Sequence, residues 1–229
     1  MSENIRISCR PHALYYERDR WIKLDSLLLK AVLQEQYGEA FQALPPVSPT
    51  TPIEALEYPD AVPLERRERL GVWYYACSWA DVEAATIRVF ATSYVRHFSE
   101  ELFRRYSLGK SREIVHTSKG VDKLVCERVR LRLVSGLVWY AVGDQAEIKR
   151  LLETYYHSIG KKESQGYGQL IPYPDGSLWK VEAVEYDYSE RDADGRATRG
   201  LPSEHGVRYP VRPPYYVRAN VAELELPPH

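Results

Sequence analysis

Two segments of the chain have the spacing of an amphipathic helix, and strand-like segments precede, separate and follow them. These are the stretches LDSLLLKAVLQEQYG, residues 24–38, and DQAEIKRLLETYYHSIG, residues 144–160. Each places apolar residues three and four positions apart, as one face of a helix requires. An order of strand, helix, strands, helix and strands predicts an α+β fold. It is compatible with a ferredoxin-like βαββαβ unit that carries long insertions.

Each helix has a candidate capping residue at its start. Asp25 follows Leu24 and is predicted to be the N-cap of the first helix, which Gly38 would end. Asp144 is predicted to cap the second helix, with Glu147 three residues later completing a pattern like a capping box.

Strands are predicted from strict alternation. Ile5, Ile7 and Cys9 alternate with polar residues in NIRISCRP, and valine and leucine alternate with arginine over residues 128–133. Gly136 interrupts the second pattern before GLVWYAVG, and we expect it to mark a β-bulge.

The C-terminal part of the chain looks irregular. Residues 189–206 are polar and glycine-containing and predict an exposed, mobile loop, and residues 207–229 mix proline, tyrosine and arginine and predict an extended strap. With 229 residues the chain can bury a sizeable core. We expect one domain over residues 1–229, with a basic insertion at about 104–123.

Bulk composition excludes several classes of protein. No apolar run is long enough to cross a membrane and no signal-peptide pattern begins the sequence, so we expect a cytoplasmic protein. Cys9, Cys77 and Cys126 are far apart and form no CxxC motif, which argues against disulfides and against structural zinc. We find no metal-binding constellation and no motif for a cofactor.

Positive charge gathers in one region of a chain whose net charge is -1. Residues 104–132 contain nine Lys or Arg residues and three acids, a local excess of +6. Such clustering suits a phosphate backbone, although a solvated surface would have the same composition. Within the thumb-like segment, residues 104–123, the predicted RNA contacts are Arg112, His116, Lys119 and Lys123.

A glycine-rich loop follows the second helix, in the stretch HSIGKKESQGYGQL, residues 157–170. It is neither a Walker A motif nor a dinucleotide fingerprint, because it follows a helix instead of preceding one. Its glycines permit positive φ and close backbone approach, while its lysines and amides suit phosphates and sugars. The loop residues predicted to bind RNA are Gly160, Lys161, Lys162, Gln165, Gly166, Tyr167 and Gly168.

The stretch SIGKKESQGYGQL resembles the signature glycine-rich loop of the RAMP superfamily of CRISPR proteins, which is built on ferredoxin-like (RRM-like) folds. Four further stretches resemble the Cas five-like (Csf three) subunit of type IV CRISPR–Cas effector complexes. They are KLDSLLLKAVL, WYYACSWA, GLVWYAVGD and RPPYYVRA. The resemblance runs over most of the chain.

The resemblance implies a function in antiviral defence or plasmid interference. Such a subunit is expected to hold the 5′ handle of the guide RNA (crRNA) at one end of the effector complex, without cutting it. The implied partners are the guide RNA, a Cas seven-like backbone subunit, a large or Cas eight-like subunit and, in the assembled complex, target DNA.

Two other functions stay open at this point. A RAMP endoribonuclease that processes precursor guide RNA needs a general base and acid, for which His12 and His116 are the candidates. A histidine in either position is more often structural or simply solvated than catalytic. A protein–protein adaptor without RNA contact would use the proline-rich segments as docking straps.

Overall fold

The computed structural model describes most of the chain. It covers residues 2–12, 14–15, 22–43, 47–52, 56, 58–82, 88–96, 125–160 and 166–227. The elements in chain order are β1 (Glu3–Cys9), β2 (Leu14–Tyr15), α1 (Leu24–Tyr37), η1 (Gly38–Ala43), β3 (Arg66–Arg69), β4 (Val72–Tyr75), β5 (Asp81–Val82), β6 (Arg88–Arg96), β7 (Val125–Leu133), β8 (Leu137–Gly143), α3 (Gln145–Tyr155), β9 (Trp179–Ala183), β10 (Leu201–Pro210), η5 (Arg218–Asn220) and β11 (Val221–Glu225). This mixture of helices and antiparallel sheets confirms the predicted α+β class.

A four-stranded antiparallel sheet in the order β5-β8-β1-β9 lies at the centre of the molecule. The predicted alternation in β1 is confirmed, since Ile5, Ile7 and Cys9 are all fully buried. In the register of the sheet, Ile7 is paired with Trp139 of β8 on one side and with Val181 of β9 on the other. The apolar side of β1 therefore lies in the middle of the main core.

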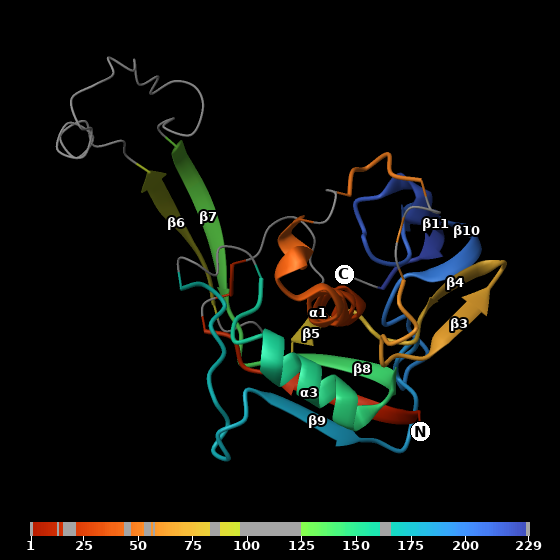
Figure 1. Cartoon of the computed structure of the whole chain (residues 1–229), viewed down its shortest axis with the longest axis horizontal. Coiled ribbons are helices and arrows are strands. Elements are labelled where there is room, and N and C mark those ends of the chain that lie inside the picture. The colour runs from red at the N-terminus through yellow and green to blue at the C-terminus, as the bar shows by residue number, and fades with distance from the viewer. Residues whose placement is uncertain are drawn as a thin grey trace.

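Helices α1 and α3 lie side by side over one face of this sheet (Figure 1). The N-cap of α3 is confirmed, because Asp144 accepts a 2.9 Å hydrogen bond from the backbone N–H of Glu147. The carboxylate of Glu153 accepts the N–H groups of Leu178 and Trp179, which joins α3 to the start of β9.

The prediction that Asp25 caps α1 is wrong. The N-cap position is Lys23, whose side chain makes no capping hydrogen bond, and Asp25 lies in the first turn of the helix. Its side chain is fully buried, where its Oδ2 accepts a hydrogen bond from the hydroxyl of Tyr215. Asp25 was predicted to be a cap because it is polar and close to the start of the helix. In the structure its partner Tyr215, which is distant in the sequence, holds it in the interior.

Strands β6 and β7 form a long hairpin that extends away from the rest of the molecule (Figure 1). They pair from Arg88 with Leu133 to Arg96 with Val125, and β2 adds a third strand to β7. The predicted bulge at Gly136 is wrong, because β7 and β8 belong to different sheets. The chain changes sheet around Gly136, where neither strand continues.

The polar segment at residues 189–206 is folded, which corrects the prediction of a mobile loop. Asp192 accepts hydrogen bonds from the N–H groups of Asp194 and Arg196, and Arg191 is bridged to Ala197. Arg199 is fully buried. The strap prediction is also incomplete, because the last residues of the chain include β11, which pairs with β10.

Candidate nucleic-acid interface

The glycine-rich loop leaves the body of the protein through a narrow neck. After α3 ends at Tyr155, the N–H of Ile159 donates to the carbonyl oxygen of Gly168 over 2.9 Å, and the N–H of Leu170 donates to that of His157 over 2.9 Å. Ser158 and Gln169 form the bridge between these two bonds. The two ends of the loop are therefore fixed to each other next to the end of α3.

The glycines at this neck are required by two different constraints. Gly160, Gly166 and Gly168 have φ angles of 101°, 81° and 72°, in the left-handed region that glycine adopts without strain. At Gly168 a Cβ would also lie 1.8 Å from the carbonyl oxygen of Ile159, so no other residue fits. At Gly166 a Cβ would meet nothing within 4 Å, and only the backbone conformation favours glycine there.

Four of the predicted RNA-binding residues lie in the described part of the glycine-rich loop. Gly160 and Gly166 are exposed, Tyr167 is half-buried, and Gly168 is buried in the neck. The other predicted contacts lie outside the described residues; they are Lys161, Lys162 and Gln165 in the loop, and Arg112, His116, Lys119 and Lys123 in the segment that connects β6 to β7.

The neck of the loop docks onto the end of β1. The N–H of His12 donates to the carbonyl oxygen of Gln169 over 2.7 Å, and the N–H of Gly168 donates to that of His12 over 3.1 Å. The N–H of Ile171 donates to the carbonyl oxygen of Arg10 over 2.8 Å. Residues 10–12 and 168–171 are thus paired, although the sequence gives no sign of it. The exposed side chain of His12 belongs to this junction.

Sequence reasoning missed a cluster of cations around one tyrosine beside this junction. The guanidinium carbon of Arg10 lies 4.5 Å from the ring centroid of Tyr173, and Nζ of Lys180 lies 4.8 Å from it. The hydroxyl of Tyr173 is 3.1 Å from Oγ of Ser8. We call Ser8, Arg10, Tyr173 and Lys180 the Tyr173 cluster. Three separate segments form it, so no local motif could have revealed it.

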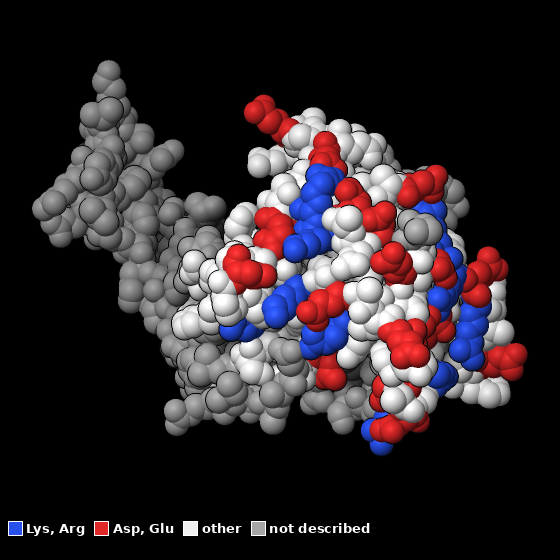
Figure 2. Space-filling model, turned by 90° about the horizontal axis from the view of Figure 1, so that it is seen from below, with Lys and Arg blue, Asp and Glu red and all other residues white. Residues whose placement is uncertain are grey.

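Several other arginines on the described surface are paired with acids. On the face shown in Figure 2, positive and negative side chains are interspersed. Arg150 contacts Glu35 at 2.7 Å, and Arg191 contacts Glu225 at 2.6 Å. Arg67 is surrounded by three carboxylates, those of Glu65, Asp187 and Glu190. Arginines neutralised in this way have less positive charge to offer a phosphate.

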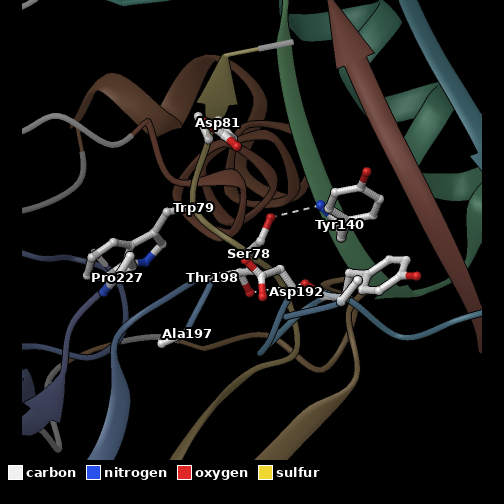
Figure 3. Close-up of a pocket in the computed structure, with 11 residues that line it drawn as sticks. Ser78, Trp79, Asp81, Tyr140, Asp192, Ala197, Thr198 and Pro227 are labelled. Carbon is white, nitrogen blue, oxygen red and sulfur yellow. Dashed lines mark hydrogen bonds between the residues drawn. The ribbon is translucent and has the colours of Figure 1, made fainter. Parts of the chain in front are cut away.

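A cavity of about 500 Å³ lies elsewhere, next to β5 and β8 (Figure 3). Within this cavity, the N–H of Tyr140 donates a 2.8 Å hydrogen bond to Oγ of Ser78. The described residues that line it include Asp81 and Asp192 but no Lys, Arg or His. The two carboxylates of this described lining repel phosphate, so they disfavour a nucleic-acid backbone there.

In the described part of the chain, no group of three His, Cys, Asp or Glu side chains is placed to hold a metal ion. None of its helices is both long enough and apolar enough to span a bilayer.

Comparison with known families identifies the chain. The family model for the CRISPR type IV associated protein Csf3 matches residues 13–227, which is nearly the whole chain of 229 residues. No curated protein matches it. The match includes helices α1 and α3, the glycine-rich loop and the β6–β7 hairpin, and it agrees with the resemblance seen in the sequence motifs. The chain therefore belongs to the Csf3 family of type IV CRISPR-associated proteins.

Proposed function

We propose that this chain is a non-catalytic, guide-RNA-binding subunit of a type IV effector ribonucleoprotein, which caps the complex at the 5′ handle of the RNA. The observation that carries the proposal is the glycine-rich loop, whose neck is fixed to both α3 and the end of β1. Residues 161–165, with Lys161 and Lys162, are inserted between these fixed ends. Because the neck of the loop is already fixed, less conformational entropy is lost when the loop binds a flexible strand.

The proposal includes a ferredoxin-like, RAMP-type domain. Its support is the strand order β5-β8-β1-β9 together with the chain order β1, α1, β5, β8, α3, β9, which gives a βαββαβ unit. The β6–β7 hairpin is then an insertion between the second and third strands of that unit. The thumb-like segment at residues 104–123 would contact RNA or a neighbouring subunit from this insertion.

Membership of a type IV family supports the proposed partners. They are the guide RNA, a Cas seven-like backbone subunit along the spacer, a large or Cas eight-like subunit and, after assembly, target DNA. The proposed place of action is the cytoplasm, where the guide RNA and its targets occur.

The test is RNA binding at several salt concentrations, by filter binding to a single-stranded guide RNA with its repeat-derived handle. The log–log slope of affinity against salt is about -0.7 per neutralised phosphate. Replacing Lys161 and Lys162 by alanine is expected to weaken binding and to reduce this slope by about 1.4. The matched control is Lys30→Ala with Lys149→Ala, two exposed lysines on α1 and α3.

Each outcome decides something about the proposal. Loss of affinity in the loop variant but not in the control supports it. Equal binding by both variants would make the loop a structural turn. Absence of salt-dependent RNA binding by the unmodified chain would overturn the proposal and favour a protein–protein adaptor.

One observation favours a second function, the endoribonuclease. His12 lies at the junction between β1 and the glycine-rich loop, where a catalytic histidine would be close to bound RNA. A histidine alone does not supply both a general base and a general acid. We therefore keep the non-catalytic function as the proposal, and a cleavage assay separates the two.

A further inference from the structure

The Tyr173 cluster is continuous with the neck of the glycine-rich loop. Ile171 is bonded to Arg10 through its N–H, and Tyr173 follows two residues later. Lys180 lies in β9, which is the neighbour of β1 in the central sheet. Chain segments near residues 10, 173 and 180 therefore meet beside the junction that holds the loop.

The positions of these side chains are fixed by the surrounding structure. The N–H of Tyr173 donates to the carbonyl oxygen of Ser177 over 2.8 Å, and the N–H of Gly176 donates to that of Tyr173 over 2.9 Å, which closes a tight turn. Arg10 donates to the carbonyl oxygen of Pro172 and lies over the Tyr173 ring. The guanidinium is held by the carbonyl and the ring while its side chain stays partly exposed.

Among the described residues, neither cation has an acid within salt-bridge distance, in contrast to the nearby Arg6. Arg6, in β1 just before Arg10, has Glu182 at 3.6 Å. Within the part of the chain that the structure describes, no carboxylate makes a salt bridge to Arg10 or Lys180. The acid that faces Lys180 is Asp175, which already accepts hydrogen bonds from the N–H and the hydroxyl of Ser177.

From this geometry we infer that Arg10 and Lys180 form a phosphate-binding site for the same RNA strand that the glycine-rich loop holds. Two cations without a salt-bridge partner among the described residues lie close to one ring centroid, so one phosphodiester, or two successive ones, can approach both. The guanidinium offers directed N–H donors and the ammonium a mobile point charge. This inference rests on the proposed RNA-binding function and extends it to residues outside the glycine-rich loop.

The test compares two charge-matched double variants in the same filter-binding assay with guide RNA. The test variant is Arg10→Gln with Lys180→Gln. The control is Arg196→Gln with Lys149→Gln, which removes one arginine and one lysine from exposed positions elsewhere. We expect the test variant to reduce the salt slope by about 1.4 and the control to leave it unchanged. When the test variant is combined with Lys161→Ala and Lys162→Ala, the reduction of the salt slope should be about twice as large.

The results separate this inference from the proposed function. An unchanged slope in the test variant, alongside a reduced slope in the loop variant, would overturn the phosphate site and leave the proposed function standing. No salt-dependent binding by the unmodified chain would overturn both. If Arg10→Gln prevents folding, Lys180→Gln alone is expected to reduce the slope by about 0.7, and an unchanged slope in that folded variant would overturn the site.

Discussion

Tyr215 donates a 2.5 Å hydrogen bond to Oδ2 of Asp25, although 190 residues separate them in the chain. Both residues lie where the C-terminal segment crosses the start of α1. Nζ of Lys23 lies 3.6 Å from the centroid of the Tyr215 ring. This contact fastens the end of the chain to the first helix, and so joins the two ends of the fold.

Burial raises the pKa of Asp25, and Arg199, Tyr215 and Lys23 only partly oppose this rise. A folded pKa above the unfolded value of 3.8 means that the folded protein binds the proton more tightly. The stability that Asp25 contributes is therefore greatest below pH 3.8 and declines as pH rises towards the folded pKa. The free energy of unfolding relative to Asp25→Asn, measured with urea at several pH values, should decrease over this range. An increase would show that the ionised carboxylate stabilises the fold.

Replacing Arg199 by methionine should be strongly destabilising, by about 3 kcal/mol or more. Its fully buried guanidinium donates to the carbonyl oxygens of Tyr75, Cys77 and Val211. The variant leaves these carbonyls without their donor in the interior. Arg196→Met is the control, because that side chain is largely exposed, and its cost should be within about 0.5 kcal/mol. Equal costs for both variants in urea unfolding would contradict the structural role of Arg199.

Changing Gly166 or Gly168 of the loop to alanine should lower the free energy of unfolding by very different amounts. Gly166→Ala adds only the strain of a positive φ, about 1 kcal/mol, because nothing lies near the added methyl group. Gly168→Ala also collides with the carbonyl group of Ile159, so the neck must open. We expect a cost of roughly 2 to 4 kcal/mol. Urea unfolding of both variants is the measurement, and similar costs would show that the neck adjusts freely.

The sequence predicted the parts of this fold that depend on local pattern. Alternation located β1, helical spacing located α1 and α3, and the capping residue Asp144 was identified. The glycine-rich loop was also found as a loop after a helix. Each of these depends on residues within one turn or one strand, where local geometry sets the pattern.

Features set by distant partners could not be predicted. Asp25 was read as a cap because its partner, Tyr215, lies near the other end of the chain. Arg199 was predicted to lie in an exposed loop because its neighbours are polar, yet it is buried and donates to the carbonyl oxygens of Tyr75 and Val211. The candidate site also depends on partners that are distant in the sequence. The docking of residues 10–12 on the loop depends on pairing between segments more than 150 residues apart.

The last prediction concerns catalysis. Cleavage of RNA at a 2′-hydroxyl needs one group to remove its proton and another to protonate the leaving oxygen. The structure places His12 at the neck of the glycine-rich loop, whereas His205 is exposed on β10. We expect no metal-independent cleavage when the chain is incubated with repeat RNA and the products are separated by electrophoresis. His12→Ala, His116→Ala and, as a control, His205→Ala should then be indistinguishable from the unmodified chain. Cleavage that disappears in His12→Ala or His116→Ala but persists in His205→Ala would replace the non-catalytic function with that of an endoribonuclease.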